Sequence, residues 1–218
     1  MKGITIEKHD KIAYSIVGKE EIDMAKNTKG EQSKNKLIKC AAKLFLQNGY
    51  NATGINDILT RTGLPKGSFY FHFSSKKDLA ISVSTYFEKN IEKWISKAAE
   101  GKVWEDFVTD LLEQMIEAAK NNKHFGCPFA VLGLEAAFSQ PDMAEYYFKS
   151  MKKMIDIFTR VFEFSGISSD RACIIANRAF AMYEGYLVYY RISKDINILK
   201  IMQNDLIALY KDYKQAEA

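Results

Sequence analysis

Apolar residues recur at intervals of three and four along most of the chain, and this helical period constrains the fold more than any other feature. The first clear set falls on one helix face and consists of Ile38, Ala41, Ala42 and Phe45. Nowhere does a period of two persist long enough to predict a strand. The sequence therefore predicts an all-α fold.

Glycine and proline mark where the predicted helices begin and end. We expect a short helix after Gly54, and a second short helix from Lys66 to Phe73 whose first turn is set by Pro65. A long amphipathic helix follows from Leu79 to about Ala99. Further helices are predicted near 103–120, 128–138, 141–164, 168–193 and 196–213.

Two short helices joined by a tight glycine-containing turn at 62–64, and packed on a longer helix, form a helix-turn-helix. The second helix of such a pair can enter the major groove of DNA. Its predicted outward residues combine charge, hydroxyls and aromatic rings, and Gly67 would let the backbone approach a phosphate closely. These outward residues are Lys66, Ser68, Tyr70, Phe71 and His72.

Positive charge is concentrated in the same region. Residues 26–82 contain ten lysines and arginines but three acidic residues, whereas the whole chain has a formal charge of only +4. A local excess of this kind is typical of a surface that binds a polyanion. A solvated basic surface would have the same composition, so charge alone leaves both interpretations open.

The composition excludes several protein classes. The chain is 47% hydrophobic and 27% charged, with three prolines and 12 glycines, which fits a packed protein rather than a disordered one. We expect no membrane span and no secretion signal. Three widely spaced cysteines argue against a disulfide framework and suggest the reducing cytoplasm.

Nothing in the sequence predicts catalysis. The three histidines are scattered, no pair has the spacing of a metal site, and no glycine-rich phosphate loop is present. We therefore expect neither an enzyme, a cofactor nor a bound metal.

The motif that carries the most information is GYNAT at 49–53, INDI at 55–58 and GLPKGSFYFHFSSKKDL at 63–79. It resembles the DNA-binding domain of TetR/AcrR-type transcriptional regulators over residues 33–82. Two positions depart from the commonest pattern: Gly54 stands for a usual threonine and Pro65 for a usual serine. Each change removes a hydroxyl that could contact a phosphate.

Residues 1–30 are polar and lack a sustained period, which predicts a flexible extension; the alternative for 1–23 is an artefact of start-codon choice, with the natural start at Met24. The resemblance implies a helix-turn-helix domain at 31–78 and a domain at 79–218 that binds an effector and dimerises. It also implies that Thr53 and Lys76 contact phosphates. Residues placed in or beside the groove would be Lys66, Gly67, Ser68, Tyr70, Phe71 and His72.

The similar regulators form dimers through their last two long helices. Residues 172–192 are apolar around most of their circumference, which predicts burial on more than one side. We expect a homodimer that reads an inverted repeat in double-stranded DNA. The alternative is an internal helix of a monomer.

The body is rich in aromatic residues and methionines, and the spaces between helices of a bundle commonly hold ligands. We expect a small hydrophobic effector whose binding favours a conformation that releases DNA. Candidate effector-binding residues are Phe107, Cys127, Phe129, Leu132, Tyr147, Tyr183 and Tyr186, with Glu184 as a further polar candidate.

Cys127 precedes Pro128, which predicts a helix with Cys127 at its N-cap. The partial positive charge there would lower the pKa of the thiol. A Gly-Cys-Pro segment at this point resembles one subgroup of these regulators, so a thiol-based electrophile or redox sensor is one alternative. A small buried residue at a tight helix start is another. A DNA-binding protein without an effector also stays open.

Overall fold

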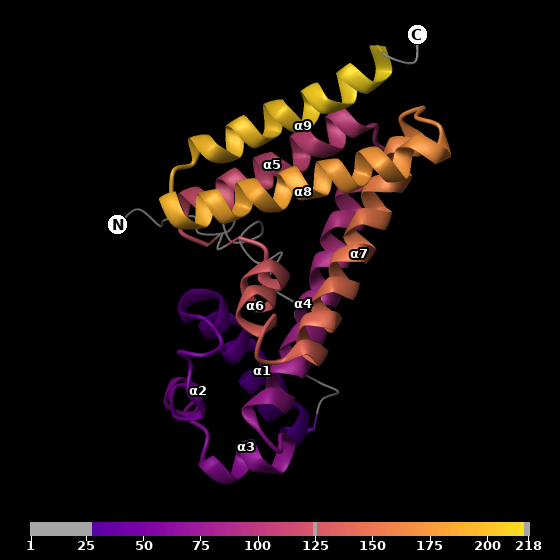
Figure 1. Cartoon of the computed structure of the whole chain (residues 1–218). Helices are drawn as coiled ribbons and strands as arrows, with labels where there is room; N and C mark the ends of the chain where they lie inside the picture. The colour runs from indigo at the N-terminus through magenta and orange to yellow at the C-terminus, as the bar shows by residue number, and fades with distance from the viewer. Residues whose placement is uncertain (1–27, 124–125, 216–218) are drawn as a thin grey trace.

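The computed structural model describes residues 28–123 and 126–215, and over these ranges the fold is entirely helical (Figure 1). The predicted all-α fold is confirmed. The helices are α1 (Lys29–Asn48), α2 (Ile55–Thr62), α3 (Lys66–His72), α4 (Lys76–Ala99), α5 (Trp104–Lys120), α6 (Pro128–Ala136), α7 (Pro141–Phe164), α8 (Ser169–Ser193) and α9 (Asn197–Gln215).

The first helix begins earlier than the expected domain boundary at 31. Thr28 and Glu31 form a capping box: the Thr28 N–H donates to Glu31 Oε2 at 2.8 Å and the Glu31 N–H donates to Thr28 Oγ1 at 3.2 Å. Residues 28–30 therefore belong to the cap and first turn of α1 rather than to a flexible extension. The rest of that predicted extension, and the question of a start at Met24, lie outside the described residues.

Helices α1 to α3 form one small packed unit, called the head below. Phe69, fully buried, anchors α3 against α1, and its ring contacts that of Phe73 with centroids 5.7 Å apart. Between α2 and α3, Gly63 ends α2 in the left-handed conformation with φ of 66°. This turn directs α3 away from α2 with its outer face in solvent.

Helices α4 to α9 form the body. The expected boundary between residues 78 and 79 falls inside α4, which runs unbroken from the head into the body. Trp104 holds α5 in place because its ring stacks on Phe162 at 3.8 Å between centroids and its indole N–H donates to the Leu206 carbonyl of α9 at 2.8 Å. The body is therefore a packed bundle rather than a loose array.

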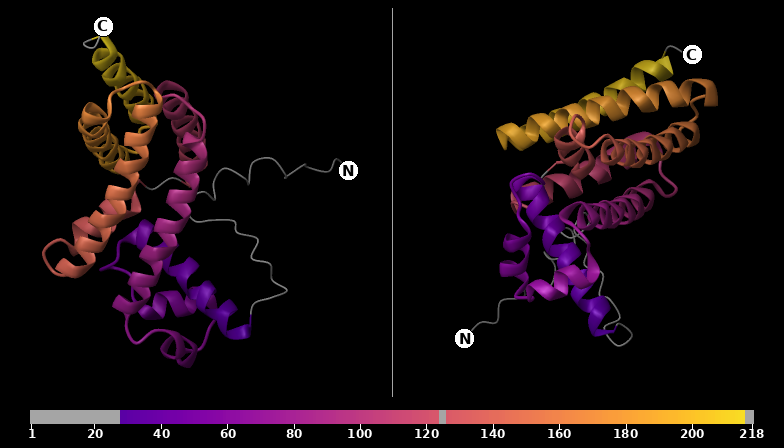
Figure 2. Two further views of the ribbon diagram at one scale, coloured as in Figure 1. Left: turned by 90° about the vertical axis from the view of Figure 1, so that its right-hand side faces the viewer. Right: turned by 60° about the horizontal axis from the view of Figure 1, so that its bottom comes forward.

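The head and the last two helices lie at opposite ends of the molecule (Figure 1), and the further views in Figure 2 agree. α3 forms one tip, α8 and α9 run side by side at the other end, and α4 and α7 connect the two. Within the described residues, no helix is long and apolar enough to cross a membrane.

Candidate DNA-binding head, effector pocket and dimer face

The outer face of α3 is exposed and partly aromatic. Phe71 is 81% exposed and Tyr70 is 52% exposed, and Lys66 lies with its Nζ 5.8 Å from the centre of the Tyr70 ring. Lys66 and Gly67 are also exposed, whereas Ser68 is half-buried. An exposed phenylalanine ring places apolar surface in water, which is unfavourable for the free protein. Such a ring fits a surface that is covered when a partner binds.

Three residues expected at the DNA are held by internal contacts. The Thr53 side chain is buried and its hydroxyl donates to the Gly49 carbonyl at 2.7 Å. Lys76 Nζ donates to the carbonyls of Tyr50 and Thr53 at 3.0 and 3.1 Å. The Thr53 hydroxyl and the Lys76 ammonium thus fix the segment between α1 and α2, and their phosphate contacts stay predictions.

His72 is the third of these residues. Its Nε2 lies 2.7 Å from Ser33 Oγ on α1, and its ring meets that of Phe71 edge-on with centroids 4.9 Å apart. The histidine therefore fastens the end of α3 to α1 and supports the exposed Phe71 ring. A direct base or phosphate contact from His72 stays a prediction.

Besides Lys76 of α4, two polar side chains of the body, on α6 and α8, hold the head. The Glu135 carboxylate on α6 accepts hydrogen bonds from the backbone N–H groups of Tyr50 and Asn51 at 3.1 and 2.8 Å. Arg191 on α8 donates to the Leu46 carbonyl at the end of α1, at 2.8 Å. A β-carbon on Gly49 would lie 2.5 Å from Glu135 Oε1, so only glycine leaves room for this carboxylate. We call Glu135 and Arg191 the head clamp.

A pocket of about 520 Å³ lies between α6, α7 and α8. Its size falls within the roughly 300–1,000 Å³ usual for small-molecule sites. All of its lining side chains except those of Tyr147 and Glu184 lack polar groups. The lining residues are Phe129, Ala130, Gly133, Leu134, Ala137, Ala144, Tyr147, Phe148, Met151, Glu184, Gly185 and Val188.

Glu184 is the unusual member of this lining. Both carboxylate oxygens are buried, and neither accepts a hydrogen bond from an N–H or O–H group of the described ranges; the Cys127 thiol, a weak donor, lies beside them. Burial raises the pKa of the Glu184 carboxyl from 4.5 to about 7, an effect that the neighbouring Cys127 thiol partly offsets. The pocket thus contains one titratable group that is poised near neutral pH.

Cys127 occupies the predicted N-cap position, and Pro128 begins α6. The expected low pKa is wrong. The thiol is buried, and desolvation together with the negative field of Glu184 raises its pKa well above the ordinary value of 9.0. Hydrogen bonds from the backbone of Phe129 and Ala130 act in the other direction but are outweighed. The helix-end effect assumed an exposed thiol.

The other expected effector residues are dispersed. Phe129 and Tyr147 line the pocket, as does Glu184. Phe107 instead lies in the aromatic core beside Trp104, and the Tyr186 hydroxyl bonds to Asp205 on α9. Leu132 and Tyr183 are buried, the latter with its hydroxyl 3.9 Å from Met115 Sδ. The structure therefore does not bring these seven residues together around one cavity.

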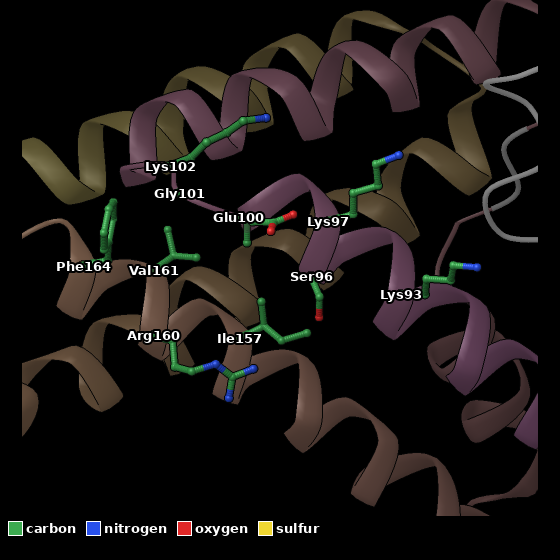
Figure 3. Close-up of a pocket in the computed structure, with 11 residues that line it drawn as sticks. Lys93, Ser96, Lys97, Glu100, Gly101, Lys102, Ile157, Arg160, Val161 and Phe164 are labelled. Atoms are coloured by element: carbon green, nitrogen blue, oxygen red, sulfur yellow. The ribbon is translucent and has the colours of Figure 1, made fainter.

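A second groove lies between the end of α4 and α7 (Figure 3). Ile157 and Val161 form its apolar part, while Lys93, Lys97 and Arg160 surround it. The cationic groups labelled in Figure 3 are spread around the groove rather than converging on one point. It lacks the buried polar group that distinguishes the first pocket.

One face of α8 and α9 is exposed although much of it is apolar or small. Ile192 is 78% exposed and Ile174 is 53% exposed, although they lie at opposite ends of α8. Ala181 and Gly185 between them are also exposed, and Gly185 lies at the edge of the pocket as well. On α9, Ile201 is 45% exposed. Residues 172–192, which were predicted to be buried on more than one side, therefore keep one exposed face in the single chain.

Comparisons with known proteins identify the family. Residues 37–83 match the profile described as bacterial regulatory proteins, tetR family, and residues 105–205 match that of the transcriptional regulator LmrA/YxaF-like C-terminal domain. The chain belongs to the TetR family of bacterial transcriptional regulators. Its head is the helix-turn-helix DNA-binding domain of that family.

Curated TetR relatives match across head and body. The HTH-type regulator LmrA of Bacillus subtilis is 28% identical over 156 residues, which cover 70% of this chain and 83% of LmrA. The regulator YxaF of the same organism is 26% identical over 182 residues, covering 82% of this chain and 95% of YxaF. The proteins of this family are regulators rather than enzymes.

Solved TetR structures share the fold. A TetR regulator from Agrobacterium tumefaciens superposes with a TM-score of 0.74 at 18% identity, covering 82% of this chain and 97% of that one. The reduced form of NemR from E. coli gives 0.72 at 18% identity, covering 80% and 95%. The assignment to a subgroup through the Gly-Cys-Pro segment stays a prediction.

The sequence did not reveal the head clamp of this TetR protein. Glu135 and Asn51 are 84 positions apart, and Arg191 and Leu46 are 145 apart. No local pattern marks such pairs. Gly49 offered the one available signal, because a glycine at a helix end can reflect close approach of another group as well as a turn.

Proposed function

We propose that this TetR protein is a repressor that binds an inverted-repeat operator as a homodimer in the cytoplasm and releases it when a small, mainly apolar effector enters the pocket between α6, α7 and α8. The observation that carries the proposal is the position of α6. One side of this helix lines the pocket through Phe129 and Gly133, while Glu135 on the same helix holds the head.

DNA recognition rests on the exposed face of α3. Phe71 and Ser68 are the candidates for base contacts, Phe71 against a thymine methyl group. Lys66, Gly67 and Tyr70 would contact the sugar-phosphate backbone, which supplies most of the affinity and makes it dependent on salt. Because His72 is bonded to α1 and Lys76 to the segment between α1 and α2, His72 acts mainly by holding α3 in position and Lys76 by holding that segment.

Dimerisation rests on the exposed apolar face of α8 and α9. Two copies related by a two-fold axis would cover Ile174, Ile192 and Ile201, and the small Ala181 and Gly185 would let the two α8 helices approach closely. The two α3 helices would then face the same side of a duplex. Such a pair reads half-sites about one helical turn apart.

Effector coupling follows from the head clamp. An effector that displaces α6 moves Glu135, and with it the backbone at Tyr50 and Asn51 that joins α1 to α2. A typical coupling of about 1–3 kcal/mol weakens operator binding roughly 5–150-fold. A DNA-binding protein without an effector, which is the alternative function, would show no such coupling. Titration with effector therefore distinguishes the repressor from this alternative.

The thiol-sensor alternative is less favoured, because the Cys127 thiol is buried and its pKa is raised. The test is fluorescence anisotropy with a labelled duplex from the region upstream of the gene. Wild-type protein should bind this duplex more tightly than a scrambled duplex and lose affinity as effector candidates are added. The assignment of α3 as the reading face would be refuted if the wild-type protein bound both duplexes equally. It would also be refuted if a Phe71→Ala variant bound the labelled duplex as tightly as the wild-type protein.

A further inference from the structure

The effector pocket is almost wholly apolar, with one exception that indicates what it binds. Aromatic and aliphatic side chains cover α6, α7 and α8 where they face the space, among them Phe129, Phe148 and Met151. The Tyr147 hydroxyl already accepts a hydrogen bond from Ser84 at 3.1 Å. Among the described lining residues, Glu184 is thus the one whose side-chain polar atoms have no N–H or O–H partner.

The environment of the Glu184 carboxylate is energetically unfavourable for a charged group. Both oxygens are buried, and no N–H or O–H group in the described part of the chain donates to them; the weakly donating Cys127 thiol is beside them. A buried polar group without a partner destabilises the folded protein, and a charged group does so more strongly. Unpartnered groups of this kind in native proteins call for an explanation, and a ligand that supplies the missing partner is one.

The groups that face Glu184 define the charge of that ligand. Cys127 lies beside it at the start of α6, and Tyr183 precedes it on α8; both are neutral near pH 7 because burial raises the pKa of each. Tyr147 on α7 is also neutral, since burial raises its pKa to about 12. None of these groups offers a positive charge, so an ionised Glu184 has no counter-ion in the described residues.

We propose that the pocket between α6, α7 and α8 binds an apolar molecule that carries a single protonated amine, and that the Glu184 carboxylate is the counter-ion of that amine. This inference rests on the proposed function, because it assigns the chemical class of the effector. The apolar walls supply affinity and the carboxylate supplies selectivity. An anionic ligand would meet a like charge, and a neutral ligand would leave the ionised carboxylate without a counter-ion.

The test compares two molecules of nearly the same shape. Diphenylpropylamine carries an ammonium group where diphenylpropanol carries a hydroxyl, and binding of each is measured by isothermal titration calorimetry without DNA. We expect the amine to bind at least about tenfold more tightly at pH 8, because both ligands can donate a hydrogen bond to the carboxylate but only the ammonium also supplies the opposite charge. The preference should shrink toward pH 6 as Glu184 takes up a proton.

Glu184→Gln keeps the shape but removes the charge, and should bring the two affinities within about twofold of each other. Glu113→Gln, on the exposed side of α5, is the matched control and should keep the wild-type preference. Gly133→Leu should weaken both ligands, because its side chain enters the pocket. Circular dichroism of each variant verifies folding. Equal affinities of wild-type protein for amine and alcohol would overturn the proposal, as would an amine preference that survives Glu184→Gln.

The proposed function is tested separately by adding the same molecules to the complex with DNA. An amine that binds with the expected dependence on Glu184 but leaves the operator complex intact would support the site and refute effector-driven release. Release of the operator by a neutral compound, combined with no preference for the amine, would overturn the cation assignment and support the proposed function.

Discussion

Replacing Glu184 by glutamine should stabilise the fold at alkaline pH and change it much less at acid pH. The folded protein holds the Glu184 proton to a pKa of about 7, whereas the unfolded chain releases it near 4.5. Between these values the folded state binds more protons than the unfolded state, so the free energy of unfolding falls as the pH rises. The destabilisation by Glu184 is absent below the lower pKa and complete above the higher one.

The magnitude follows from the two pKa values. Raising the pKa of a carboxyl from 4.5 to about 7 costs the folded state roughly 3 kcal/mol once the group is ionised in both states. Glutamine carries no charge at any pH and avoids this cost. The stabilisation by Glu184→Gln should therefore be larger at pH 8 than at pH 5, by roughly 2–3 kcal/mol.

Urea unfolding followed by circular dichroism measures this difference at both pH values. Protein concentration is held fixed because dimerisation would contribute to the apparent stability. Glu113→Gln, from the exposed face of α5, is the control and should show the same small effect at both pH values. Equal effects of Glu184→Gln at pH 5 and pH 8 would refute the claim that the carboxyl is buried without an N–H or O–H donor.

Three further predictions concern the head, the clamp and the thiol. Lys66→Ala should lower operator affinity and reduce the slope of log affinity against log salt by about 1, measured by anisotropy from low to moderate salt; an unchanged slope would place Lys66 away from the phosphates. In the Glu135→Ala variant, the ratio of operator affinity without effector to that with effector should fall toward one, because the acceptor for the Tyr50 and Asn51 N–H groups is lost. Glu135→Gln should keep part of the response to effector. A full response in the alanine variant would show that coupling follows another route. Iodoacetamide at pH 8 should alkylate the exposed Cys173 well before the buried Cys127, as read by peptide mass spectrometry, and the difference should vanish in denaturant; comparable native rates would restore the sensor hypothesis.

Local sequence signals predicted the helices closely because helix ends are set locally. Pro128 begins α6 and Pro141 begins α7 where the sequence indicated, and Gly63 separates α2 from α3. The expected domain boundary at 31 did not use the capping-box spacing of Thr28 and Glu31, which begins α1 at Lys29. That signal is local and does not depend on a long-range contact.

The site was less predictable because its properties depend on burial and on distant partners. The pKa of Cys127 rises because burial outweighs the helix end, and burial could not be deduced from the N-cap position. His72 and Lys76 are residue types that commonly contact DNA, yet each forms a hydrogen bond with a segment remote in sequence. Aromatic content likewise could not distinguish Phe107 in the core from Phe129 at the pocket.

The central claim is that the two heads of a homodimer, joined through their paired helical bodies, read a symmetric duplex through α3. Selection of bound sequences from a random duplex pool tests it most directly, since no operator needs to be known beforehand. We predict enrichment of an inverted repeat with half-sites about one helical turn apart, and loss of that enrichment with Phe71→Ala. Enrichment of a single asymmetric site, or of no sequence at all, would contradict the account.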